Sequence, residues 1–285
     1  NAWSKLSIGK CRYGLMLNED GMVYDDGVTT RLAENHYLMT TTTGGAANVL
    51  GKLEDYLQTE WPELDVYLTS VTDHYSTASV CGPNSKKIIN KIFPQLDLSD
   101  ENFPHMSFKN TKLDNINCRV MRISFTGELS YEINIESKYG KSLWEKCISA
   151  GQEFNITPYG TETMHLLRAE KGFIIVGQDT DGTMTPSDLQ MDWIVSKKKY
   201  DFIGKRSLYR SDTIRDDRKQ LVGLLTDDPK EVLEEGAQLV ESLEKPIDML
   251  GHVTSSYFSP NLNKSIALAI VRSGKKLKGK KLIVP

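Results

Sequence analysis

The chain has 285 residues, 39% of them hydrophobic, so it can bury a substantial core and is long enough for two or three domains. Its 35 basic and 38 acidic side chains give a net charge of −3, which provides no general attraction for nucleic acid or an anionic membrane. No apolar run reaches the roughly 18 residues of a membrane helix, and the four cysteines form no CxxC pair. We therefore expect a cytoplasmic protein with reduced thiols, whose partners are small molecules or other proteins.

The first 72 residues alternate short β-like runs with one helix. An apolar stripe at helical spacing predicts a helix over residues 46–61, with the striped face packed inward. Residues 64–71 and 76–81 read as strands. Pro83 suits the first turn of a second helix, and the apolar stripe that follows it consists of Ile88, Ile89, Ile92 and Phe93.

The centre of the sequence predicts a polar loop over residues 97–115 and then a pair of strands within 118–135, joined by a turn at 126–128. On the second strand the apolar and polar residues alternate with a period of two, so Glu132 points away from the apolar face. That apolar face carries Tyr131, Ile133 and Ile135.

Two more helices are predicted over residues 139–154 and 161–171, the second ended by Gly172. From about Lys197 the sequence becomes basic and then consists mainly of short β-like segments, which predicts a separate C-terminal β domain. We accordingly expect three domains, residues 1–72, 73–200 and 201–285. The β-like segments of the last domain are 220–225, 251–257, 265–271 and 282–284.

Two adjacent acids, Asp25 and Asp26, stand out in the VYDDG run. Val23, Tyr24 and Val28 around them favour a strand, and neighbouring residues of a strand project to opposite faces. At most one of the two carboxylates can therefore face a given pocket, and the other is expected to be structural. For an arbitrary pair of aspartates a solvated turn is the commoner explanation, so the pair alone does not establish a site.

Other motifs favour structural explanations. The glycines at 44 and 45 precede a helix, but neither the GxxxxGK[ST] nor the GxGxxG spacing is present. The DTDG run at 179–182 has Gln190 where a calcium loop would close with glutamate, and the five histidines show no HExxH spacing, so we predict no metal site. The lysine-rich run 274–282 is expected to be a solvated β-hairpin.

Four stretches go further: NEDGMVYDDGVTTRLAENHYLMTTTTG (18–44), FTGELSYEI (125–133), DFIGKRSL (201–208) and TSSYFSPNLNKSIALA (254–269). In sequence and in order they resemble the aminomethyltransferase family, the glycine-cleavage T-protein and its relatives. Residues 158–186 and 219–240 resemble, more closely, the C-terminal region of the α subunit of heterotetrameric sarcosine oxidases. The resemblance implies an α+β fold, a three-domain cloverleaf that holds tetrahydrofolate, N-terminally incomplete here and with a C-terminal β-barrel-like domain.

The resemblance also implies roles for particular residues. The family's catalytic aspartate falls on Asp25, and its pterin-binding glutamate falls on Glu132. Phe125 stands where many relatives have a tyrosine, and Thr42 where many have an asparagine, both at the folate pocket. Asp26 is then the structural neighbour of Asp25.

The implied reaction joins the one-carbon unit of an imine, made by oxidative demethylation of sarcosine, to tetrahydrofolate, giving 5,10-methylenetetrahydrofolate and glycine. FAD, FMN and NAD are then expected only in the remaining half of the α subunit or in the other subunits, which are the expected protein partners. One alternative is a stand-alone aminomethyltransferase or a dimethylglycine-oxidising relative, but Met164 occupies the place of an arginine that T-proteins carry. A second alternative is a non-catalytic scaffold or regulator, against which the presence of Asp25 and Glu132 argues.

Overall fold

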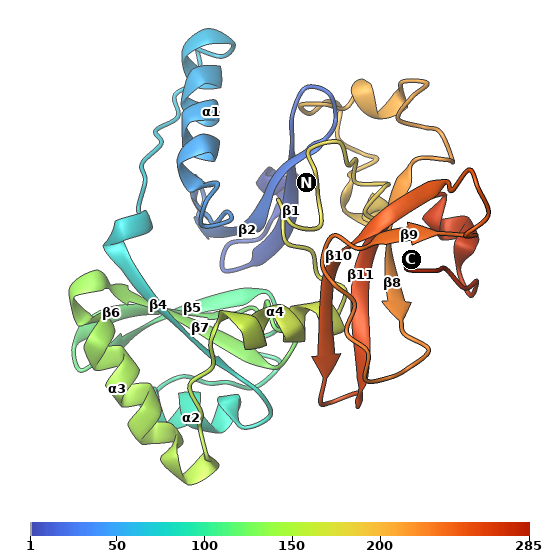
Figure 1. Ribbon diagram of the computed structural model, residues 1–285. Coiled ribbons are helices and arrows are strands. Elements are labelled where there is room, and N and C mark those ends of the chain that lie inside the picture. Colours follow the sequence, from blue (N-terminus) through green and yellow to red (C-terminus); the bar gives the residue numbers. More distant parts are fainter. Residues whose placement is uncertain (1) are drawn as a thin grey trace. The chain divides into compact units, whose positions relative to one another are not determined.

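The computed structural model describes residues 2–285, which form four α-helices and three β-sheets (Figure 1). None of these four helices is both long and apolar enough to cross a membrane. The chain folds into two compact units, one formed mainly by Gly14–Asp26 and Thr161–Pro285, the other by Trp3–Tyr13 and Gly27–Gly160. The expected α+β fold with a C-terminal β domain is confirmed.

The first sheet has the order β1-β2-β3. Its long middle strand passes from one unit into the other between Asp26 and Gly27. A Cβ at Gly27 would lie 1.9 Å from the carbonyl oxygen of Thr40, so only glycine fits where β2 passes the backbone of Thr40. The strands are β1 (Cys11–Leu17), β2 (Val23–Ala33) and β3 (His36–Met39).

The helix α1 (Ala46–Thr59) forms as predicted, but its apolar stripe is fully buried only at Val49. Further along, Tyr56 stacks on Trp61, which is 40% exposed. The prediction of a strand over residues 64–71 is wrong, because within residues 2–285 this segment pairs with no other strand. Hydrophobic alternation alone does not make a strand when no partner edge is available.

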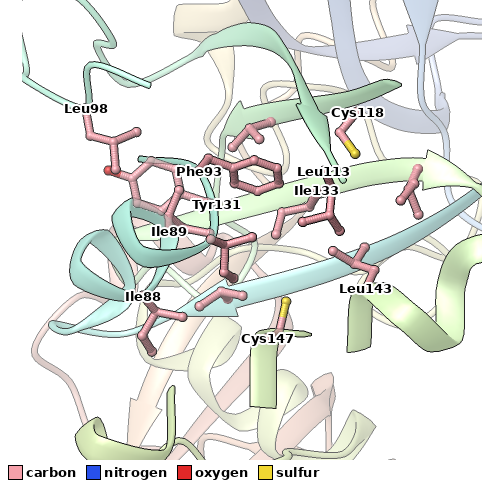
Figure 2. Packing of buried hydrophobic residues seen from close by; sticks show 14 of the residues in the cluster. Ile88, Ile89, Phe93, Leu98, Leu113, Cys118, Tyr131, Ile133, Leu143 and Cys147 are labelled. Carbon is pink, nitrogen blue, oxygen red and sulfur yellow. The ribbon is translucent and has the colours of Figure 1, made fainter. Parts of the chain in front are cut away.

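The middle sheet has the order β4-β7-β6-β5 and is antiparallel throughout. Helices α2 (Ser85–Ile92) and α3 (Gly140–Gly151) cover one of its faces, and Figure 2 shows the apolar side chains between them. The predicted strand pair and both helices are confirmed. The strands are β4 (Tyr75–Cys81), β5 (Ser107–Leu113), β6 (Ile116–Arg122) and β7 (Ser130–Glu136).

Strand β5 lies inside the stretch that the sequence predicts to be a polar loop, so that prediction is wrong. Its alternation is hidden because several of its side chains are polar. Asp114 and Asn115 have φ values of 47° and 71°, which form the tight turn that joins β5 to β6. This Asp-Asn pair is the sequence signal that could have identified the hairpin.

The unit that contains the C-terminal half has the sheet β8-β11-β10-β9, against which α4 (Thr161–Glu170) packs. Gly172, with φ +70°, ends α4 as expected. Two expectations fail: residues 282–284 form only a single bridge from Ile283 to Val240, and the lysine-rich run begins as a 3₁₀ turn over Gly274–Leu277, not as a hairpin. The strands are β8 (Lys219–Leu225), β9 (Gln238–Val240), β10 (Met249–Ser259) and β11 (Lys264–Arg272).

Candidate functional site

Asp25 lies in β2 and is buried, with 2% of its surface exposed, on the same face as the core residue Val23. The Val23 N–H donates to the carbonyl oxygen of Met184 at 2.8 Å, which anchors this end of the strand. The Asp26 N–H donates to Oδ1 of Asp25 at 2.7 Å. Asp26 itself is only half-buried. The sequence argument that the two acids face apart is therefore confirmed, and Asp25 is the buried member.

Glu132 lies at the middle of β7, between Tyr131 and Ile133, which are both fully buried beneath α2 and α3. Because the side chains of a strand alternate, the Glu132 carboxylate lies on the other face of the sheet. In the strand register it stands opposite Ser79 of β4 and Met121 of β6. The predicted orientation of Glu132 is confirmed.

The Glu132 side chain is half-buried. This burial raises its pKa from 4.5 to about 7. Within residues 2–285 no lysine, arginine or histidine forms an ion pair with it. A carboxylate that is partly withdrawn from water costs free energy in the folded protein, and a ligand that supplies hydrogen-bond donors or positive charge offsets that cost.

A tyrosine and two serines lie near Glu132. Burial raises the pKa of Tyr159 to about 12, with smaller contributions from Ser79, Cys81 and the charge of Glu132. Ser79 Oγ also lies 3.3 Å from Ser130 Oγ. Sequence reasoning missed Tyr159, because nothing in the local pattern around residue 159 indicates that its hydroxyl lies near enough to Glu132 to feel its charge.

The other predicted residues occupy loops. Phe125 is half-buried in the turn between β6 and β7, the same hairpin that carries Glu132. Thr42 accepts a 3.1 Å hydrogen bond at Oγ1 from the N–H of Gly45, the N-cap residue just before α1, so it shapes the entry to that helix. Met164, which stands where the resemblance expects an arginine, is half-buried on α4.

The predicted site residues divide between the two units. Asp25 belongs to the unit that contains the C-terminal half, whereas Thr42, Phe125 and Glu132 belong to the other unit. Within that second unit, Phe125 and Glu132 share one hairpin. No group of three or more histidine, cysteine, aspartate or glutamate side chains among residues 2–285 could hold a metal ion.

Two family models match the sequence. The GCVT N-terminal domain matches residues 1–199, and the glycine cleavage T-protein C-terminal barrel domain matches residues 219–285. The structure is similar to that of the glycine cleavage system aminomethyltransferase T from Bartonella henselae, with a TM-score of 0.82 and 24% sequence identity over 98% of this chain and 72% of that one. The fold is therefore that of the T-protein.

Whole-chain relatives are of two kinds. The chain is 56% identical to sarcosine oxidase subunit alpha of Corynebacterium sp. (strain P-1) and 42% identical to that of Rhizobium meliloti (strain 1021), in both cases over its full length. It spans only about 30% of those subunits. It is also 31% identical to an aminomethyltransferase of Thermoanaerobacter pseudethanolicus, over 96% of this chain and 71% of that protein.

Proposed function

The chain belongs to the glycine-cleavage T-protein family, and from this premise we propose that it is the tetrahydrofolate-binding, one-carbon transfer module of a sarcosine oxidase α subunit. The identity of 42–56% to sarcosine oxidase α subunits over the full chain supports this subunit over a stand-alone aminomethyltransferase, to which the identity is 31%. The observation that carries the folate assignment is the half-buried Glu132 carboxylate on a sheet face, whose pKa burial raises and which has no ion-pair partner within residues 2–285.

The surroundings of Glu132 fit the ring end of a reduced folate. A pterin presents two N–H donors side by side, and a carboxylate can accept both, as it does from an arginine side chain. A ligand that brings its own donors replaces the water that burial removes. Phe125, on the same hairpin, would pack against the ligand ring, and Thr42 would shape the loop beside it.

Asp25 is proposed to act on the reacting atoms. Tetrahydrofolate, when bound, supplies the nitrogen nucleophile that takes up the one-carbon unit. A buried carboxylate stabilises the positive charge of a protonated imine far better than an exposed one, because water screens it less. The Asp26 N–H bond to Oδ1 fixes the orientation of that carboxylate. Asp25 could also accept a proton during the transfer.

The complete reaction needs more than this chain. Oxidation of sarcosine to its imine is assigned to flavin, FAD or FMN, in the rest of the α subunit or in other subunits, and NAD is expected there too. Those subunits are the proposed partners, and the cytoplasm is the proposed location. The module would convert the imine and tetrahydrofolate to 5,10-methylenetetrahydrofolate and glycine.

The Asp25→Ala variant of the complete oxidase tests this assignment. Peroxide formation from sarcosine should be largely unchanged, because it belongs to the flavin site. The yield of methylenetetrahydrofolate should fall at least tenfold, the order expected when a group that stabilises charge in the transition state is lost. Formaldehyde should appear in its place, because water then hydrolyses the imine. Asp26→Ala is the matched control and should retain most of the yield. An unchanged yield in Asp25→Ala would contradict the role of Asp25.

A further inference from the structure

The apolar stripe of helix α1 is only partly covered. The helix carries its apolar residues on one face, as a helix does when that face packs on a core. Val49 is the one residue of α1 that is fully buried. The rest of the stripe is half-buried, at Leu50, Leu53, Tyr56 and Leu57. The other elements within residues 2–285 therefore leave part of this face open.

The segment that follows α1 has the alternation of a strand but no partner. It runs from the end of α1 towards β4 (Figure 1), and within residues 2–285 it pairs with no other strand. In a strand, Leu64, Val66 and Leu68 would share one face, and Tyr67 would lie on the other. Leu64 and Val66 are 49% and 50% exposed. An unpaired segment of this kind can accept a further strand through its backbone N–H and C=O groups.

The stripe and the segment form one continuous surface. The rings of Tyr56 and Trp61 stack with their centroids 5.1 Å apart, and the Leu64 N–H donates to the carbonyl oxygen of Trp61 at 3.1 Å. We call the stripe, Trp61 and residues 64–68 the α1 surface. Its border is acidic, because residues 46–71 contain a single basic residue, Lys52, and five exposed acids. These acids are Glu54, Asp55, Glu60, Glu63 and Asp65.

We propose that the α1 surface is the docking site for an extended segment of the same polypeptide, which lies outside residues 1–285 and pairs with residues 64–70 as a β-strand. The chain spans only about 30% of the sarcosine oxidase α subunits that it resembles, so most of such a subunit is available to supply this segment. A tethered segment docks at a high effective concentration, which favours it over a second copy of the chain. Its apolar side chains would cover the stripe, and flanking lysine or arginine residues would face the acidic border.

Hydrogen–deuterium exchange of the complete oxidase tests the docking site. Peptides that cover residues 64–70 should exchange at least about 100-fold more slowly than an unstructured peptide, because paired amides exchange only when the strand opens. Val66→Asp places a charge on the docking face, and its exchange should return to within about tenfold of the unstructured rate. Tyr67→Asp is the matched control, because Tyr67 is 90% exposed and lies on the opposite face, and it should keep the protection. The amides of β7 should stay protected in all three proteins, which checks that the middle sheet is folded.

Photocrosslinking identifies the occupant. With p-benzoylphenylalanine in place of Leu64 in the complete oxidase, the crosslinked peptide should lie in the same α chain, outside these 285 residues, and the mass of the chain should not increase. A crosslink to another subunit or to a second α chain would overturn the proposed occupant.

The docking site itself has two further ways to fail. Exchange of residues 64–70 at the unstructured rate in the wild-type oxidase would overturn it, and so would equal protection in Val66→Asp and Tyr67→Asp. This inference rests on the proposed function only in taking the chain as part of a longer α subunit. Binding of folinic acid by the wild type is a separate measurement, so the failure of one proposal is distinguishable from the failure of the other.

Discussion

Two carboxylates, one in each unit, differ in the partners that their surroundings provide. Asp179 is fully buried and forms an ion pair with the fully buried Arg168. It also accepts hydrogen bonds from the hydroxyls of Thr254 and Ser255 and from the N–H of Ile175. Glu132, by contrast, has no ion-pair partner within residues 2–285, and burial raises its pKa.

This difference separates a structural acid from a binding acid. A buried charge that is paired and hydrogen-bonded on every side has no capacity left for a ligand, and its loss damages the fold. A half-buried carboxylate without an ion-pair partner, such as Glu132, destabilises the fold when it is ionised, and a protein retains such a group where function needs it. Mutations of the two acids should therefore have opposite effects on stability.

The largest effect is expected from Asp179→Asn. The substitution leaves the Arg168 guanidinium buried without a counter-charge, which should lower the free energy of unfolding by about 3–5 kcal/mol. The midpoint of urea unfolding, followed by circular dichroism, measures this loss. Asp181→Asn is the control, because Asp181 lies two residues away, is exposed and accepts hydrogen bonds from Thr183 at the surface, and the variant should lose less than about 1 kcal/mol. Equal losses of unfolding free energy in the two variants would show that the Arg168–Asp179 ion pair does not cause the loss.

A smaller effect with the opposite sign is expected from Glu132→Gln. The pKa of Glu132 is about 7 in the folded protein and near 4.5 when unfolded, so the folded state binds the proton more tightly, and the free energy of unfolding falls as the pH rises between these values. Glutamine removes the charge, so the variant should be more stable than the wild type by about 1–2 kcal/mol at pH 8. The two proteins should converge below pH 4.5.

Thermal unfolding of both proteins at pH 4.5, 6 and 8 measures this difference. A variant that is less stable than the wild type at pH 8 would mean that Glu132 has a stabilising partner, which would remove the contrast with Asp179. Glu132 would then be a structural acid, as Asp179 is.

The sequence predicts the direction of the Glu132 side chain but not the ion pair of Asp179. The alternation of Tyr131, Ile133 and Ile135 is enough to turn Glu132 away from the core, and the same argument separates Asp25 from Asp26, because a strand has a fixed period. The family resemblance, not the spacing, indicates which acid binds folate. Local pattern therefore predicts the direction of a side chain well when the strand is correctly identified.

What the sequence does not predict depends on contacts between distant segments. Nothing local indicates that Asp179 pairs with Arg168, since this contact joins α4 to a loop that follows it. The failed strand at 64–71 and the missed strand β5 have the same origin. Whether a segment becomes a strand depends on the edge it can pair with, and that edge lies elsewhere in the sequence.

Proton release on folate binding tests the central claim most directly. At pH 7 about half of the Glu132 side chains carry a proton, and a ligand whose N–H groups bind the carboxylate should displace it. Titration of folinic acid into the protein in two buffers of different ionisation enthalpy should therefore show about half a proton released per ligand bound. Glu132→Gln should bind at least tenfold more weakly and release none. Equal affinity and equal proton release in the wild type and the variant would contradict the assignment of Glu132 as the folate anchor.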